Sequence, residues 1–140
     1  MGSRMAANLL KSGHELIVWN RTKGKESQLV EMGAKVASSL SDAVNHSDII
    51  ITMLSTPAAV TDVALGPEGF LSKANKNTLW INSSTINPSF AKEMAAKAKD
   101  AGIRYLDAPV SGSKIPAEKG ELLFLVGGEE QDLELAMPLL

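Results

Sequence analysis

The sequence contains no cysteine. This absence excludes disulfide bonds, thiolate metal ligands and cysteine nucleophiles, and it is typical of a reducing compartment. No apolar run approaches the roughly 20 residues that a membrane-spanning helix needs. The polar residues Ser3 and Arg4 interrupt the N-terminus too early for a signal peptide. We therefore expect a cytoplasmic protein with no membrane partner, and an organellar location of a longer parent protein stays open.

The net charge is small, and histidine is rare. The 14 basic and 16 acidic residues give a net charge of −2, and the basic residues are scattered, so no nucleic-acid partner is expected. The only histidines, His14 and His46, follow no predicted strand, and we interpret them as surface residues. No His, Asp or Glu cluster has metal-ligand spacing, and no Ser-His-Asp arrangement is evident, so no metal site is expected.

The apolar pattern alternates between strand-like and helix-like segments over residues 1–140, enough for one domain. This alternation predicts an α/β fold of the Rossmann type: a doubly wound, mostly parallel sheet with helices on both faces. Strands are expected over 16–19, 34–37, 48–54, 78–82, 103–106 and 122–126. Helices are expected from the start of the chain to Gly13, over 24–32 and 41–45, from Thr56-Pro57, from Asn87-Pro88 to Gly102, and from near Glu129.

The chain opens inside a helix, whereas a doubly wound domain normally opens with a strand. The start MGSRMAANLL resembles the tail of a G-x-G-x-x-G turn and its helix, with Gly2 as the last glycine. We expect the first strand to be missing from the middle of the sheet, between the strands at Leu16 and Asp48. The alternative is that Met1 is a true start and the fold differs.

The segment after the predicted strand at 16–19 is suited to a nucleotide. A dinucleotide-binding domain presents this strand tip to the adenosine ribose, where an acidic residue selects NAD. Here the tip reads Asn20, Arg21 and Thr22. A guanidinium pairs well with phosphate, so NADP is favoured over NAD as the cofactor. The alternative is a solvated surface arginine at a strand end.

Hydroxyl groups follow two further strands. Ser55 comes after the strand that ends at Leu54, and Ser83, Ser84 and Thr85 come after the strand that ends at Asn82. Both groups stand at carboxyl ends of strands, where the ribose and nicotinamide of a dinucleotide would lie. Each group is also an ordinary helix-start signal, so only their joint placement favours the cofactor site.

The segment Asp107–Gly128 contains a loop of small polar residues, among them Ser111, Gly112 and Ser113, just past a strand end. Small residues let backbone N–H groups approach a carboxylate closely, which predicts a small-acid binding site. An ordinary strand–turn–strand connection is the equally weighted alternative.

These motifs resemble the N-terminal domain of the β-hydroxyacid dehydrogenases, a family that includes 3-hydroxyisobutyrate dehydrogenase and the glyoxylate/succinic semialdehyde reductases. The resemblance extends over essentially the whole chain. It is carried by the segments MGSRMAANLLKSGHEL, VWNRT, SSTINP and DAPVSGSKIPAEKGEL, and the last is closest to the glyoxylate and succinic semialdehyde reductase branch.

The resemblance implies a role for each matched position. Gly2 would lie under the pyrophosphate, and Asn20, Arg21 and Thr22 would hold the 2′-phosphate of NADP. The cofactor path would be lined by Leu54 and Ser55, and Thr85 would approach the nicotinamide ribose. The substrate carboxylate would be bound by Ser111, Gly112 and Ser113.

The resemblance also implies that the catalytic residue is not in this chain. The family's proton-donating lysine comes from a helix beyond Leu140, and neither Lys114 nor Lys119 matches its position. The chain would be an incomplete domain of an oxidoreductase that reduces a small aldehyde acid, such as glyoxylate or succinic semialdehyde. The parent protein would form a homo-oligomer through a helical second domain. The rival interpretation is a non-catalytic, dehydrogenase-like binding or scaffold module.

Overall fold

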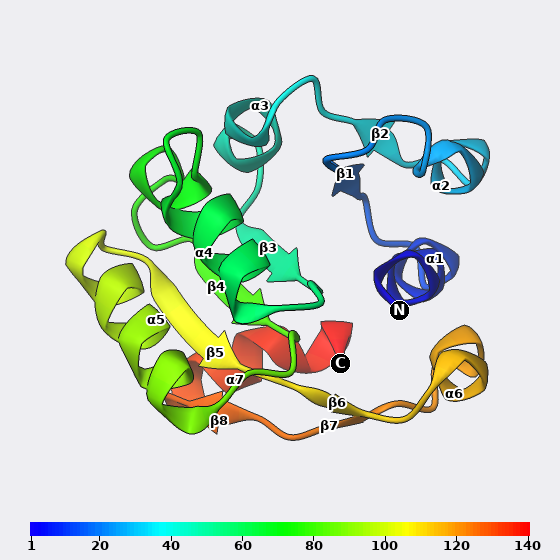
Figure 1. Ribbon diagram of the computed structural model, residues 1–140. Coiled ribbons are helices and arrows are strands. Elements are labelled where there is room, and N and C mark those ends of the chain that lie inside the picture. The colour runs from blue at the N-terminus through cyan, green and yellow to red at the C-terminus, as the bar shows by residue number, and fades with distance from the viewer.

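Helices and short strands alternate along the chain in the computed structural model, which describes residues 1–140 (Figure 1). The strands are β1 (Ile17–Val18), β2 (Lys35–Val36), β3 (Ile49–Thr52), β4 (Leu79–Asn82), β5 (Arg104–Asp107), β6 (Val110–Ser111), β7 (Leu123–Phe124) and β8 (Gly127–Gly128). The α-helices are α1 (Gly2–Lys11), α2 (Ser27–Glu31), α3 (Leu40–Asn45), α4 (Pro57–Leu65), α5 (Pro88–Asp100), α6 (Lys114–Lys119) and α7 (Glu130–Ala136). Two 3₁₀ turns, η1 (Phe70–Ser72) and η2 (Met137–Leu139), complete the set.

The strands form a divided sheet. Strands β3, β4 and β5 are parallel, and Ile49 stands opposite Leu79, which stands opposite Arg104. The short strand β8 closes this part as an antiparallel edge. Strands β1 and β2 form a separate parallel pair, and no strand lies between β1 and β3. The predicted α/β class and the mostly parallel sheet are confirmed.

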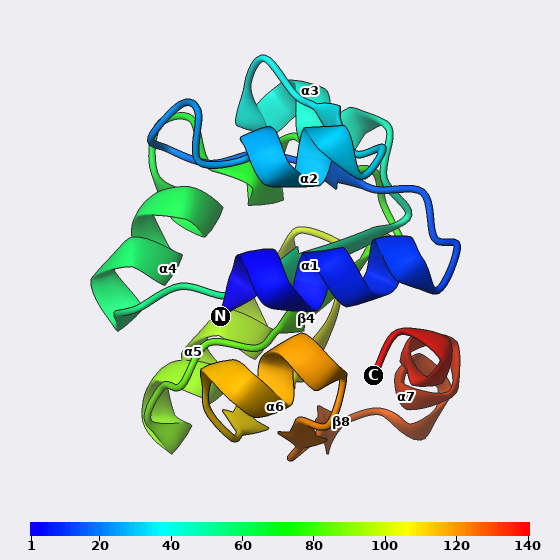
Figure 2. The same cartoon turned by 90° about the vertical axis from the view of Figure 1, so that its right-hand side faces the viewer.

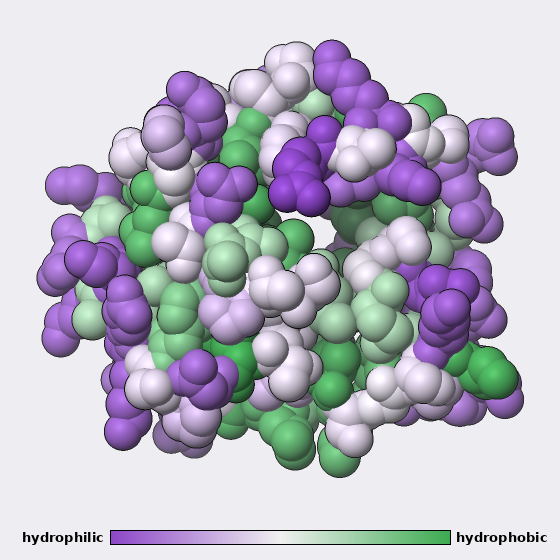
Figure 3. All heavy atoms as spheres, viewed as in Figure 1, coloured by the Kyte–Doolittle hydropathy of each residue, from purple (hydrophilic) through white to green (hydrophobic).

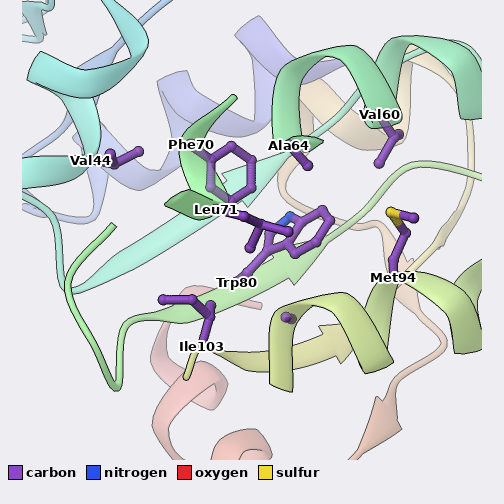
Figure 4. Close-up of a cluster of buried hydrophobic side chains, with 9 residues drawn as sticks. Val44, Val60, Ala64, Phe70, Leu71, Trp80, Met94 and Ile103 are labelled. Carbon is purple, nitrogen blue, oxygen red and sulfur yellow. The ribbon is translucent and has the colours of Figure 1, made fainter. Parts of the chain in front are cut away.

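The core lies on both faces of β4, as a doubly wound sheet requires. Trp80 projects toward α4, η1 and α5 and packs among Val60, Phe70 and Met94 (Figure 4). The rings of Phe70 and Trp80 meet edge to face with centroids 5.1 Å apart. On the opposite face, the neighbouring residues Leu79 and Ile81 pack against Leu106, Ala108 and Ala136. The alternation of side chains along one strand therefore supplies two separate apolar layers.

Most helix boundaries follow the expected capping signals. The side chains of Thr56 and Asn87 accept hydrogen bonds from backbone N–H groups in the first turns of α4 and α5, as predicted. The prediction that Ser41 begins α3 was wrong: Ser39 is the N-cap, and its side chain accepts from the N–H of Asp42. Helix α2 starts at Ser27, later than expected, because residues 24–26 form a turn.

The segment after β5 differs most from the expectation. We expected a loop of small polar residues between the strands at 103–106 and 122–126, but the chain forms the hairpin β6–β7 with helix α6 inserted between its strands. Figure 2 shows α6 lying beside α1, and Figure 1 shows both helices to one side of β3, β4 and β5. None of the helices combines the length and the apolar character of a membrane span.

Candidate functional site

A buried polar network joins the carboxyl ends of β3 and β4. The indole Nε1 of Trp80 donates to the hydroxyl of Thr52 at 2.8 Å, and that hydroxyl donates to Oδ1 of Asn82 at 3.0 Å. The Nδ2 group of Asn82 donates to the hydroxyl of Tyr105 at 3.2 Å. Asn82 is completely buried. Buried polar groups need such partners, so this network determines how the ends of the three strands sit against one another.

The network extends into the two loops that were predicted to contact a cofactor. The backbone N–H of Ser84 donates to Oδ1 of Asn82 at 3.2 Å, and the hydroxyl of Ser84 accepts from the N–H of Leu54 at 3.0 Å. Ser84 is fully buried, whereas Ser55 and Thr85, the next residues in each loop, are exposed. The predicted residues Leu54, Ser55 and Thr85 are therefore brought together at one edge of the sheet.

Two ionisable groups beside this network have shifted pKa values. Burial raises the pKa of the Tyr105 hydroxyl to about 12, so it stays protonated at neutral pH. Burial also raises the pKa of Asp107, at the end of β5, and its buried Oδ1 atom has no hydrogen-bond partner. Both effects follow from the cost of charge at a partly desolvated strand end.

Sequence reasoning missed Thr52, Asn82 and Tyr105 as parts of this site. A signal was available, because Thr52 and Asn82 are polar residues within strands that are otherwise apolar. Their positions, opposite each other in the register of β3 and β4, could not be known before the strands were paired.

Helix α1 begins at the same edge. A Cβ atom on Gly2 would lie 3.5 Å from the Cβ of Met53, which follows β3 directly. No side-chain hydrogen bond caps the N-terminus of α1. The free N–H groups of a first helical turn attract anions, so this helix end is suited to a phosphate group.

The predicted phosphate-binding residues lie on the other part of the sheet. Asn20, Arg21 and Thr22 follow β1 after one residue, Trp19, and all three are exposed. The Arg21 guanidinium makes no ion pair. They follow the β1–β2 pair, which is not hydrogen-bonded to the sheet that carries the loops after β3 and β4, so they are a separate element of the candidate site.

The small-residue loop has a conformation that requires glycine. Gly112 has φ +137°, and a Cβ there would lie 2.7 Å from Cδ2 of Leu122 and 3.3 Å from Cβ of Pro116. Its neighbours Ser111 and Ser113 are exposed. The loop thus presents two hydroxyls and a close-packed backbone to solvent.

Helix α6 ties this loop to α1. The side-chain amide of Asn8 donates to the backbone oxygen of Ala117 at 2.6 Å. The guanidinium of Arg4 pairs with the carboxylate of Glu118 at 2.6 Å, a contact that is partly exposed. The predicted substrate loop and the predicted pyrophosphate helix are consequently held as one unit.

Two surface pockets lie away from the candidate site. One is lined by residues of α4, η1 and α5, and the other by Arg104 and residues 129–132. No group of three or more His, Asp or Glu side chains is placed to hold a metal ion.

A doubly wound sheet, an uncapped helix N-terminus and hydroxyl-bearing loops at the carboxyl edge together define a nucleotide-binding domain of the Rossmann class. The family model for the NAD-binding domain of 6-phosphogluconate dehydrogenase matches residues 1–140. The chain belongs to this family of NAD-binding domains.

Its relatives include enzymes of the predicted group. The chain is 43% identical over 136 residues to the probable mitochondrial 3-hydroxyisobutyrate dehydrogenase of Dictyostelium discoideum, covering 97% of this chain and 42% of the relative. It is 41% identical over 140 residues to the chloroplastic glyoxylate/succinic semialdehyde reductase 2 of Arabidopsis thaliana, covering 100% of this chain and 39% of the relative.

A solved structure of a 3-hydroxyisobutyrate dehydrogenase is also similar to this chain. The 3-hydroxyisobutyrate dehydrogenase of Mycobacterium tuberculosis, solved with L-serine, matches with a TM-score of 0.89 and 38% identity, covering 99% of this chain and 47% of that one. The chain thus spans less than half the length of each of these three relatives. The resemblance to the β-hydroxyacid dehydrogenases, which are enzymes, is confirmed for the N-terminal domain.

Proposed function

We propose that residues 1–140 are the NADP-binding domain of a longer oxidoreductase. The observation that carries the proposal is the meeting of the uncapped N-terminus of α1 with the tips of β3 and β4. Gly2 lies against Met53, and the next residue, Leu54, is hydrogen-bonded to Ser84. An anion-attracting helix end and two anchored loops at one sheet edge are what a dinucleotide needs.

The donor set at this edge fits a nicotinamide dinucleotide. The first turn of α1, beginning at Gly2, would hold the pyrophosphate through backbone N–H groups. The backbone at Leu54, with Ser55, would line the cofactor's path, and Thr85 would face the nicotinamide ribose. The buried network around Asn82 would keep both loops in place while the exposed hydroxyls contact the cofactor.

The preference for NADP rests on Arg21. This guanidinium is exposed and unpaired, and it follows the strand tip where a 2′-phosphate would lie. Asn20 and Thr22 flank it with neutral hydrogen-bonding groups, and no carboxylate stands there to repel a phosphate. A charge-assisted hydrogen bond of this kind contributes about 1.5–3 kcal/mol.

The parent protein would reduce a small aldehyde acid to the hydroxy acid. The bound cofactor supplies the hydride for this reaction. Ser111, Gly112 and Ser113 would bind the substrate carboxylate, and the link from α6 to α1 would hold that loop near the cofactor. The lysine that donates the proton would lie in a helix beyond Leu140, within a helical domain through which the protein assembles.

The relatives indicate two groups of substrate for the parent protein. The relatives carry the names of 3-hydroxyisobutyrate dehydrogenase and glyoxylate/succinic semialdehyde reductase at nearly equal identity. The segment with Ser113, Lys114 and Glu118 favours glyoxylate or succinic semialdehyde on the resemblance described above. A scaffold role is the alternative, but a scaffold has no need of a loop suited to a carboxylate, such as the one that contains Ser111, Gly112 and Ser113.

The experiment is a calorimetric titration of the chain and its Arg21→Asp variant with NADPH and NADH. We expect the substitution to weaken NADPH binding by about 10–100-fold, because a phosphate partner becomes a repelling charge. NADH binding should change far less. The matched control is Lys92→Asp, which makes the same charge change at an exposed position on α5. An equal loss for both cofactors in Arg21→Asp would overturn the NADP assignment.

A further inference from the structure

One face of helix α1 lies against helix α6 (Figure 2). Arg4 and Asn8 are four residues apart in α1, so their side chains share that face. The Asn8 amide donates to the backbone oxygen of Ala117, and the Arg4 guanidinium donates to the carboxylate of Glu118, each at 2.6 Å. The two acceptors are consecutive residues of α6. Two neighbouring contacts therefore fix α6 against α1.

The hydrogen bond from Asn8 satisfies a buried carbonyl group near the end of α6. Ala117 is completely buried. The N–H groups of Gly120 and Glu121, which follow α6, both donate to the carbonyl of Pro116. The carbonyl of Ala117 therefore has the side-chain amide of Asn8 as its donor. A buried acceptor that loses its donor is costly, so this bond determines where the end of α6 lies.

The ion pair beside this bond is weaker because it faces solvent. The side chains of Arg4 and Glu118 are 33% and 55% exposed. Figure 3 shows hydrophilic atoms on the surface where the two helices meet. An exposed ion pair of this kind contributes little to stability. Asn8 is consequently the main link between α1 and α6.

The loop that carries Ser111 and Ser113 lies directly on α6. A Cβ on Gly112 would be 3.3 Å from the Cβ of Pro116, which is closer than ordinary van der Waals contact. Pro116 is the residue before Ala117, and Ser113 immediately precedes α6. The position of α6 therefore determines the position of the loop that is expected to bind the substrate carboxylate.

The other end of this series of contacts lies at the edge proposed for the cofactor, where α1 begins with Gly2 against Met53. We infer that Asn8 is a positioning residue that couples the two sites: a cofactor bound at the start of α1 orders the substrate loop through Asn8 and Ala117. This inference rests on the proposed function and adds an order of binding, with the cofactor before the aldehyde acid. Coupling between two sites is reciprocal and typically amounts to about 5–150-fold in affinity.

The experiment measures hydrogen exchange of the backbone amides in the chain, with and without saturating NADPH. We expect NADPH to slow exchange over residues 111–121 by about fivefold or more. In Asn8→Ala, NADPH should still slow exchange in the first turn of α1 but no longer over 111–121. Helix α3 lies far from α6 in both Figure 1 and Figure 2, so its exchange serves as the reference that NADPH should leave unchanged.

The matched control is Asn75→Ala. The Asn75 side chain also donates to a backbone oxygen, that of Asn45 at 3.3 Å, but it lies away from both sites. This variant should respond to NADPH as the wild type does. An Asn8 with a purely structural role would speed exchange over 111–121 by the same factor with and without NADPH, and that result would overturn the inference.

A second variant keeps the test decisive if Asn8→Ala does not fold. Glu118→Gln removes the ion pair with Arg4 and leaves the bond from Asn8 in place, so it should keep most of the NADPH effect over 111–121. Complete loss of the effect in Glu118→Gln would make the ion pair the link and contradict the role of Asn8.

The wild-type chain separates the inference from the proposed function. Protection of α1 by NADPH without any change over residues 111–121 would contradict the coupling and leave the cofactor site standing. A chain that does not bind NADPH would overturn the proposed function, and the coupling with it.

Discussion

Replacing Asn82 by alanine tests how far the candidate site depends on the buried network. The side chain is completely buried, and its Oδ1 atom accepts from the hydroxyl of Thr52 and the N–H of Ser84. Asn82→Ala leaves both donors without an acceptor in buried positions. An unsatisfied buried donor costs about 1–3 kcal/mol, so we expect the free energy of unfolding to fall by about 2–6 kcal/mol.

This loss is large against the roughly 5–15 kcal/mol that stabilises a typical domain. It is measured by urea denaturation, followed by circular dichroism. The control is Tyr105→Phe, which removes only the hydroxyl that accepts from Nδ2 of Asn82. It leaves one buried donor unsatisfied instead of two and should cost about 1–3 kcal/mol. If Asn82→Ala costs no more than Tyr105→Phe, the network does not determine the positions of the two loops.

Three further predictions follow from single residues. Gly112→Ala should lower the unfolding midpoint more than Gly24→Ala, because both residues have positive φ but only Gly112 has neighbours that a Cβ would meet; equal losses in a thermal melt would count against a close-packed loop. Asp107→Asn should stabilise the chain at pH 7, and this advantage should shrink as pH falls through the raised pKa of the native carboxyl and vanish below the ordinary value of 3.8. The reason is that burial raises the pKa of Asp107 in the folded state, so its ionisation costs stability at higher pH; a difference independent of pH in urea titrations would contradict this. In the complete enzyme, Ser111→Ala should raise KM for the aldehyde acid more than KM for the cofactor, and equal increases in steady-state kinetics would refute its role in the substrate loop.

The sequence predicted the fold well where local signals and burial agree. The N-caps Thr56 and Asn87 and the buried strand β4 all lie where the pattern placed them. The strands β1 and β2 are shorter than predicted, with two residues each. Each of these strands pairs only with the other. The residues at their ends therefore have no further strand whose hydrogen bonds would keep them extended.

Helix α6 was not predicted because its signals are weak. Its six residues include Pro116, and Ser113 at its N-cap forms no side-chain capping bond. Its packing against α1, through Asn8 and Arg4, is a tertiary contact between segments more than 100 residues apart. Such contacts stabilise short helices that propensity alone would not form.

The most direct test of the central claim is a thermal melt of the chain alone, with millimolar NADPH, with millimolar NADH and without a cofactor. An intact nucleotide site that recognises a 2′-phosphate through Arg21 predicts a cooperative transition whose midpoint NADPH raises more than NADH does. A transition that neither cofactor moves would contradict the account that residues 1–140 form an NADP-binding domain.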